Sequence, residues 1–163
     1  MSPFELADAA EAGDLPRVHL LLERDPAAID LPRQDGWTPL HLAAFYGRTD
    51  VAELLLSQGA GVDVASANVM TNRPLHAAVA GRHLALVELL LGHGADPNAP
   101  QHGGWTPLQG AAQHGDLATI RVLLAHGADP AARSDDGRKA SDLALAGGHS
   151  EVVELLSRVA ARE

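Results

Sequence analysis

The sequence contains no cysteine, a single lysine and few aromatic residues. Without cysteine there can be no disulfide framework and no thiolate chemistry. Twelve basic residues, of which only Lys139 is a lysine, stand against 21 acidic ones, and the formal net charge is −9. The chain therefore lacks the excess of positive charge that binding to nucleic acids or anionic membrane surfaces requires. We predict no nucleic-acid partner and no membrane partner.

Long hydrophobic runs are also absent. No apolar stretch approaches the roughly 20 residues of a membrane span. Acidic residues near the start, such as Glu5 and Asp8, are not expected in a signal peptide, which begins with positive charge followed by an apolar segment. We therefore expect a cytoplasmic monomer. Aromatic residues make up 3% of the chain and hydrophobic residues 46%, so alanine and leucine must fill the core. This composition favours short helices packed closely together.

One stretch of the sequence recurs at a fixed interval. Leu40 and Leu75 are 35 residues apart, and the steps from Leu75 to Leu108 and from Leu108 to Ser141 are 33 each. Such a period is typical of a solenoid, in which each unit must stack on its neighbours to bury its apolar face. The four copies are Gly36–Ala44, Arg73–Ala78, Gly104–Ala112 and a divergent Gly137–Ala144.

Each residue of the best copy has a local role. Thr38 can cap a helix with its hydroxyl, and Pro39 suits the first helical position. Gly47 can adopt the left-handed conformation that ends this helix. A second helix is expected over 51–57, ended by Gly59. The unit is thus predicted to be helix, turn, helix and extended hairpin.

The repeats divide the whole chain. We predict one domain over residues 1–163, an all-α repeat solenoid of about five helix-turn-helix units with β-hairpin fingers. Ser2 and Glu5 read as a capping box for the first helix, and Ser141 and Ser157 place polar residues where earlier units have leucine. The predicted units are an N-terminal cap at about 1–35, full units at 36–69, 70–102 and 103–135, and a C-terminal cap at 136–163.

The third unit departs from the pattern and is predicted to be the softest. Arg73 replaces the capping threonine, which should cost about 1 kcal/mol unless Thr71 or Asn72 substitutes for it. Arg82 stands where other units have glycine, and a left-handed conformation there would cost about 1–2 kcal/mol. Gly81 could avoid that cost by taking the turn itself.

Together these units resemble the ankyrin repeat. The matching residues are Gly36-x-Thr38-Pro39-Leu40-His41-Leu42-Ala43-Ala44-x-x-Gly47, then Val51-x-x-Leu54-Leu55-Leu56, and the His-Gly-Ala-Asp helix ends at His93 and His126. The resemblance covers essentially the whole chain. It implies an L-shaped stack of antiparallel helix pairs with projecting fingers, and a module that binds proteins through the fingertips and a concave face.

No residue pattern points to catalysis. No Gly-x-Ser-x-Gly turn, phosphate-binding glycine loop or His-Glu-x-x-His helix is present. We predict that the chain is not an enzyme and has no cofactor. Six of the nine histidines fall at repeat positions, where a structural role is expected. These are His41, His76, His83, His93, His126 and His149.

Aromatic residues stand where the repeat leaves the choice open. Trp37 and Trp105 follow a turn glycine, and Phe45 and Tyr46 precede a helix-ending glycine. The resemblance places these positions in the concave groove, and Trp and Tyr are enriched at binding hot spots. The predicted partner-binding residues are Trp37, Phe45, Tyr46, Met70, Asn72, Trp105, Gln113 and His114.

Three interpretations remain open at the level of sequence. The favoured one is a module that binds an unidentified partner protein through these residues. A second is a metal or small-ligand site near His102 and His114, with acids such as Asp136. The third is a passive structural spacer, in which each tryptophan only packs on a neighbouring finger.

Overall fold

A computed structural model describes residues 4–161. These residues form ten α-helices and no strand, with short 3-10 turns at Pro26–Asp30 and His102–Gly104. The chain divides into two compact units, Met1–Ala95 and Asp96–Glu163, and each is described by itself below. The single-domain assignment and the limits of the individual repeats stay predictions.

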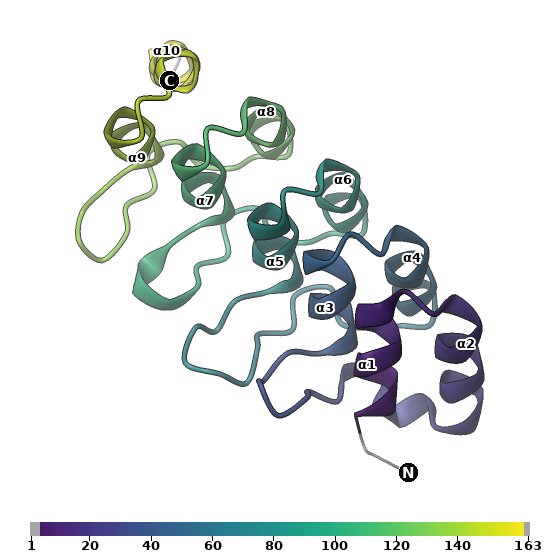
Figure 1. Cartoon of the computed structure of the whole chain (residues 1–163). Coiled ribbons are helices and arrows are strands. Elements are labelled where there is room, and N and C mark those ends of the chain that lie inside the picture. The colour runs from purple at the N-terminus through teal and green to yellow at the C-terminus, as the bar shows by residue number, and fades with distance from the viewer. Residues whose placement is uncertain (1–3, 162–163) are drawn as a thin grey trace. The chain divides into compact units, whose positions relative to one another are not determined.

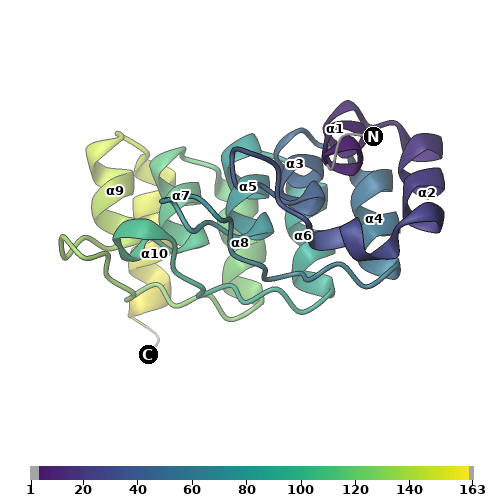
Figure 2. The same cartoon turned by 90° about the horizontal axis from the view of Figure 1, so that it is seen from below.

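The first unit contains three helix pairs. In Figure 1, α1, α3 and α5 form one row and α2, α4 and α6 a second row. Each first helix contacts the next one in its row, and the loops before α3 and α5 project to one side (Figures 1 and 2). The bounds are α1 Glu5–Ala12, α2 Leu15–Arg24, α3 Pro39–Phe45, α4 Thr49–Ser57, α5 Pro74–Gly81 and α6 Leu84–Gly92.

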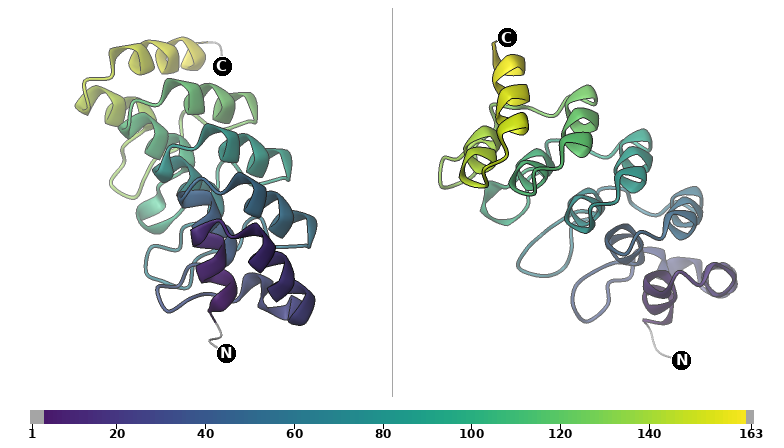
Figure 3. Two further views of the ribbon diagram at one scale, coloured as in Figure 1. Left: turned by 45° about the vertical axis from the view of Figure 1, so that its right-hand side comes forward. Right: turned by 45° about the horizontal axis from the view of Figure 1, so that its top comes forward.

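The second unit repeats this arrangement with two helix pairs. Helix α7 contacts α8 and α9, and α10 packs against α9 and α8. Figure 3 shows the two antiparallel pairs in the green and yellow part of the ribbon. The bounds are α7 Pro107–Gln113, α8 Leu117–Ala125, α9 Ala140–Ala146 and α10 Ser150–Ala160.

Threonine and proline start the first helix of a repeat as predicted. The backbone N–H of His41 donates to the Thr38 hydroxyl, and the Thr38 N–H donates to His41 Nδ1. In the second unit Gln109 takes the place of the histidine. Its backbone N–H donates to the Thr106 hydroxyl, and its side-chain oxygen accepts from the Thr106 N–H at 2.7 Å. Both pairs satisfy N–H groups that have no partner inside the helix.

Leucine and alanine form the interior, as the composition requires. The repeat leucines Leu40, Leu75 and Leu108 are almost completely buried, and the alanines that follow them allow the helices to approach closely. The corresponding Ser141 is half-buried and Ser157 is exposed. Polar side chains at these sites fit a helix pair with no repeat packed on its outer face among the described residues.

The helix ends agree with prediction except in the third repeat. Gly13 and Gly47 are left-handed, with φ of 76° and 73°. Arg82 is also left-handed, with φ 60° and ψ 40°, so the idea that Gly81 takes the turn is wrong. A side chain at Gly81 would clash with the carbonyl oxygen of Phe45. Glycine is needed there because the α5 end approaches the Phe45 carbonyl closely, and the left-handed turn falls on the next residue, Arg82.

At several helix-ending glycines, a side chain from the following repeat packs directly against the glycine. The Arg48 side chain lies against Gly13 and its Nε donates to the Glu11 carbonyl at 2.9 Å. The His83 ring lies in the same way against Gly47. In the second unit the His149 ring lies against Gly115. A methyl group on any of these glycines would meet the overlying side chain, so each position needs glycine for space as well as for its positive φ.

Helix α5 lacks the cap bond from the residue before it, although His76 Nδ1 accepts from the Arg73 N–H at 3.2 Å. An arginine side chain has no hydrogen-bond acceptor, and no cap bond is made from position 73. Thr71 is left-handed, with φ 47°, and the Asn72 side-chain oxygen accepts from the Ser66 hydroxyl at 2.6 Å. Neither residue substitutes for the missing cap. The softness of the third repeat stays a prediction.

The β-hairpin form of the fingers is not confirmed. Each loop is closed by one backbone bond, such as Arg33 N–H to Trp37 O at 2.9 Å and Gln101 N–H to Trp105 O at 2.9 Å. One such bond beside a left-handed residue does not build a strand ladder. The predicted Ser2 cap and the tail at 162–163 lie outside the described residues.

Candidate protein-binding surface

Three aromatic residues of the first unit lie together, and we call them the aromatic surface: Trp37, Phe45 and Tyr46. Trp37 lies in the loop before α3, Phe45 is the last residue of α3, and Tyr46 follows it. The Phe45 ring stands edge-on to Trp37, with centroids 5.3 Å apart, and edge-on to Tyr46 at 5.1 Å. Edge-to-face pairs of this kind are favourable beyond the area they bury. The sequence prediction therefore grouped residues that are in contact.

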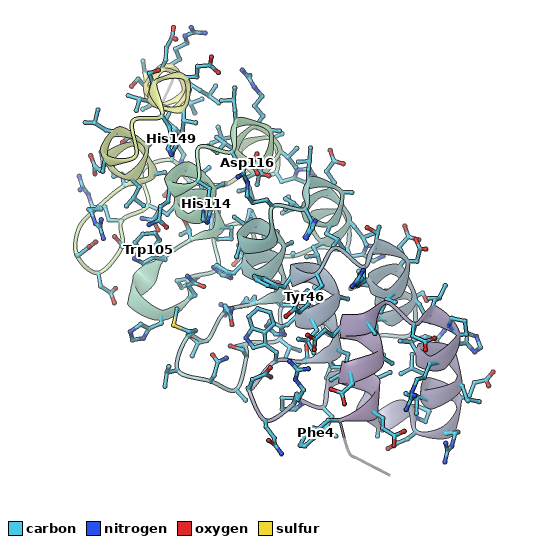
Figure 4. The ribbon with its side chains drawn as sticks, viewed as in Figure 1. Phe4, Tyr46, Trp105, His114, Asp116 and His149 are labelled. Atoms are coloured by element: carbon cyan, nitrogen blue, oxygen red, sulfur yellow. The ribbon has the colours of Figure 1, made fainter. Side chains whose placement is uncertain are left out.

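Exposure differs among the three rings. Tyr46 is 42% exposed, whereas Trp37 and Phe45 are half-buried. Trp37 also packs against His41, with ring centroids 5.9 Å apart. Trp37 and Phe45 therefore support the fold as well as presenting a surface. Tyr46, labelled in Figure 4, is the most exposed of the three rings.

An arginine and three carboxylates border the aromatic surface. Arg33 forms ion pairs with Asp8 and Glu11 of α1 and with Asp35 of its own loop. Burial opposes ionisation of Asp35, but hydrogen bonds from Arg33 and the Trp37 N–H outweigh it and lower its pKa. The hydrogen bond to Asp35, with a second one to Glu11, raises the pKa of the Arg33 guanidinium. The neighbouring Glu11 carboxylate, which can accept from the Tyr46 hydroxyl, raises the pKa of Tyr46.

The third-repeat loop carries exposed apolar side chains. The Ala67 N–H donates to the Gly36 carbonyl at 2.8 Å, and the Asn68 side chain donates to the Asp35 carbonyl at 2.8 Å. The next residue, Val69, is 81% exposed, and Met70 is 45% exposed. The sequence prediction included Met70 and missed Val69, although the two residues are adjacent in the same loop.

Asn72 connects this loop to the start of α3. Its backbone carbonyl accepts a hydrogen bond from His41 Nε2 at 2.9 Å. Its side chain is half-buried and bonded to Ser66. Asn72 therefore fixes the base of the loop that carries Met70, and its predicted role in binding stays a prediction.

In the second unit, Trp105 pairs with an arginine. The Arg138 guanidinium lies over the Trp105 ring, 5.5 Å from its centroid. Arg138 also forms an ion pair with Asp136, with its Nε donating at 2.7 Å. The bond from Arg138, with another from the Ser134 hydroxyl, lowers the pKa of Asp136 to about 2. The sequence prediction missed Arg138 as a partner, although it occupies the same repeat position as Trp105.

Gln113 and His114 lie at the end of α7, and both are exposed. The Gln113 carbonyl accepts a hydrogen bond from His149 Nε2 at 3.1 Å. Figure 4 labels His114, His149 and Trp105 in this unit. These residues and the aromatic surface belong to different units and are described separately.

Comparison with known families agrees with this geometry. Residues 6–101, more than half of the chain, match the family described as ankyrin repeats (3 copies). The chain belongs to the ankyrin-repeat family. Residues 109–156 match a second description, ankyrin repeats (many copies). Ankyrin repeats are generally non-catalytic modules for protein–protein interaction.

The ankyrin-repeat relatives are much longer proteins. The chain is 35% identical over 101 residues to human BCL-6 corepressor-like protein 1, which covers 62% of the chain and 6% of that protein. It is 39% identical over 85 residues to serine/threonine-protein kinase VIK of Arabidopsis thaliana, covering 52% and 19%. For palmitoyltransferase Hip14 of Drosophila melanogaster the identity is 35% over 96 residues, covering 59% and 15%. The chain thus spans less than a fifth of each of these relatives.

Most repeat histidines of this ankyrin-repeat chain make structural bonds. Burial lowers the pKa of His41, so its neutral ring accepts at Nδ1 and donates from Nε2. His93 and His126 each donate from Nδ1 to a carbonyl one turn earlier, at 2.9 Å. Among residues 4–161 no group of three or more His, Cys, Asp or Glu side chains could hold a metal ion. Asp136, named in the metal interpretation, pairs with Arg138.

The helices of this ankyrin-repeat chain are short. Within the part of the chain that the structure describes, none has the length and apolar character needed to cross a bilayer.

Proposed function

We propose that this ankyrin-repeat chain is a non-catalytic module that binds a partner protein through the aromatic surface and the tip of the third-repeat loop. The observation that carries the proposal is the state of Tyr46. Its ring is held edge-on by Phe45, with centroids 5.1 Å apart, yet 42% of the residue is exposed. A ring already fixed in place loses little conformational freedom on binding, which favours its use as an anchor.

The neighbouring loop supplies apolar area for the same contact. Val69 and Met70 are exposed next to Asn68, which is bonded to the Asp35 loop below the aromatic surface. Exposed apolar side chains that gather in this way mark interaction sites more often than single ones do. Met70 adds a flexible side chain that can adapt to a partner.

The proposal extends to a contact on the second unit. Trp105, Gln113 and His114 occupy the repeat positions of Trp37, Phe45 and Tyr46. The two side chains at the end of α7 are exposed, so a partner can reach them. We include in the proposal that the chain acts as a monomer in the cytoplasm. Size-exclusion chromatography with light scattering would test the monomeric state.

Site-specific photo-crosslinking in source cells tests the binding surface. A photoreactive phenylalanine analogue is placed at Tyr46 or Met70, and as a matched control at Leu20, which is 54% exposed on α2. We expect the same partner protein to be captured from positions 46 and 70 and not from position 20. Equal capture from all three, or capture from position 20 alone, contradicts the proposal.

A substitution separates binding from folding. Tyr46→Ala should remove partner capture while lowering the free energy of unfolding by only about 0.5–1.5 kcal/mol, because the variant loses the edge-on contact with Phe45 but leaves the core intact. Trp37→Ala is less informative because Trp37 is half-buried and packs against two rings. If Tyr46→Ala strongly lowers the unfolding midpoint of a chain that still folds and still captures its partner, Tyr46 has a packing role instead.

A further inference from the structure

The second unit shows how this fold seats an arginine on a tryptophan. Trp105 follows the left-handed Gly104, and Arg138 follows the left-handed Gly137 one repeat later. The Arg138 guanidinium lies over the Trp105 ring, and the Asp136 carboxylate accepts hydrogen bonds from the edge of that guanidinium. The face of Trp105 is therefore occupied by a residue of the same chain.

The same repeat position in the first unit is filled differently. Trp37 follows the left-handed Gly36, and the position one repeat later is Asn72, which follows the left-handed Thr71. Asn72 carries no charge, and its carbonyl is bonded to His41. The Trp37 ring packs against His41 and Phe45, and its repeat partner supplies no guanidinium.

Negative charge nevertheless gathers beside Trp37 and Tyr46. Asp8, Glu11 and Asp35 converge on a single arginine, Arg33. Three carboxylates against one guanidinium leave an excess of two negative charges at the edge of the aromatic surface. The Asp8 and Asp35 side chains are exposed, so both can accept further hydrogen bonds from a cation outside the chain.

We propose that the aromatic surface receives an arginine side chain from the partner protein, stacked on the Trp37 and Tyr46 rings and bonded to the adjacent carboxylates. This inference rests on the proposed function, because it names the chemistry of the partner at that same surface. The guanidinium of the partner takes the part that Arg138 plays at Trp105.

Arginine fits this surface better than lysine does. Its planar guanidinium stacks on a ring and at the same time presents hydrogen-bond donors at its edge to carboxylates. A lysine ammonium is a point charge that is more strongly hydrated and cannot stack. The loop bonded to the Asp35–Gly36 turn exposes Val69 and Met70, so the predicted partner segment carries a hydrophobic residue beside the arginine.

The two tryptophans make the test direct, because each gives one indole N–H resonance in a nitrogen–proton correlation spectrum of the full chain. The probe is the peptide acetyl-Gly-Arg-Leu-Gly-amide, and its matched control has citrulline in place of arginine. We expect the arginine peptide to shift the Trp37 resonance saturably at millimolar concentration and to leave that of Trp105 nearly unchanged. The citrulline peptide should bind about two- to fivefold more weakly for loss of the ring contact alone.

Two variants control the result. Arg138→Gln uncovers the Trp105 ring, so the arginine peptide should now shift the Trp105 resonance as well. Glu11→Gln removes one carboxylate and should weaken the Trp37 response to the arginine peptide while leaving the weak citrulline response unchanged. A Trp37 resonance that does not move, or that responds equally to both peptides, overturns the arginine proposal whatever Arg138→Gln shows.

The proposed function can be judged separately. If the photo-crosslinks from positions 46 and 70 still capture a partner while arginine has no effect on Trp37, only the identity of the anchoring side chain is wrong. If the crosslinks fail as well, the surface itself is not used for binding.

Discussion

Replacing His41 by glutamine should remove part of the pH dependence of stability. His41 is completely buried, its Nε2 donates to the Asn72 carbonyl at 2.9 Å, and its Nδ1 accepts from the Thr38 N–H. In the second unit Gln109 makes the corresponding pair of bonds, accepting from the Thr106 N–H and donating to the Arg138 carbonyl at 2.8 Å. Glutamine can therefore make both bonds and does not titrate.

The size of the effect follows from proton linkage. Burial lowers the pKa of His41 in the folded chain, so in the unfolded chain the imidazole binds a proton first as the pH falls through its ordinary value of about 6.5. The stability that neutral His41 contributes is complete above that value and is lost as the pH falls toward the lower pKa of the folded state. Between pH 7.5 and 5.5 this loss is at most about 1.4 kcal/mol, or roughly 3–6 °C in the thermal midpoint.

Thermal or urea unfolding of wild type and His41→Gln at several pH values measures the difference. Other histidines titrate in both proteins and cancel in the comparison. We expect the wild type to lose more stability on acidification than the variant does. The reciprocal change Gln109→His should add pH dependence at the second site. If His41→Gln and wild type lose the same stability between pH 7.5 and 5.5, the account of a buried neutral imidazole is wrong.

Two further predictions concern the turn between α5 and α6. Arg82→Gly should stabilise the chain by about 0.5–1 kcal/mol, because relief of left-handed strain exceeds the added freedom of the unfolded glycine; an unchanged or lowered urea midpoint would contradict this. Gly81→Ala should destabilise by about 1–3 kcal/mol, because the added methyl clashes with the Phe45 carbonyl oxygen. Gly92→Ala, at a position with open space around it, is the control and should not lower the unfolding midpoint.

The sequence was sufficient to predict what depends on local chemistry. Thr38 followed by Pro39 starts a helix wherever it occurs, and Gly13 and Gly47 end helices because a left-handed residue is needed there. The period near 33 residues then fixes which helices are paired. The helix ends depend only on neighbours within a few positions, and the pairing of helices depends only on the repeat period, so the helix ends and the family could be predicted without coordinates.

Features that depend on contacts between repeats were missed. The need for glycine at position 81 comes from the Phe45 carbonyl, 36 residues earlier in the chain. The pairing of Arg138 with Trp105 likewise joins two successive loops. The grouping of Trp37 with Tyr46 could be anticipated because both flank the same short helix, but their exposures depend on the packing of the neighbouring loop and α1.

The side chains that lie over the turn glycines bear on how such a chain can be shortened. Arg48 over Gly13 and His83 over Gly47 show that one bare turn accommodates either a guanidinium or an imidazole. Removal of one whole repeat that includes Arg48 and Gly47 would place His83 over Gly13, the glycine that Arg48 covers in the intact chain. The contact between a turn glycine and the side chain of the following repeat can therefore form between repeats that were not consecutive. A chain shortened by one repeat should still fold without a compensating substitution.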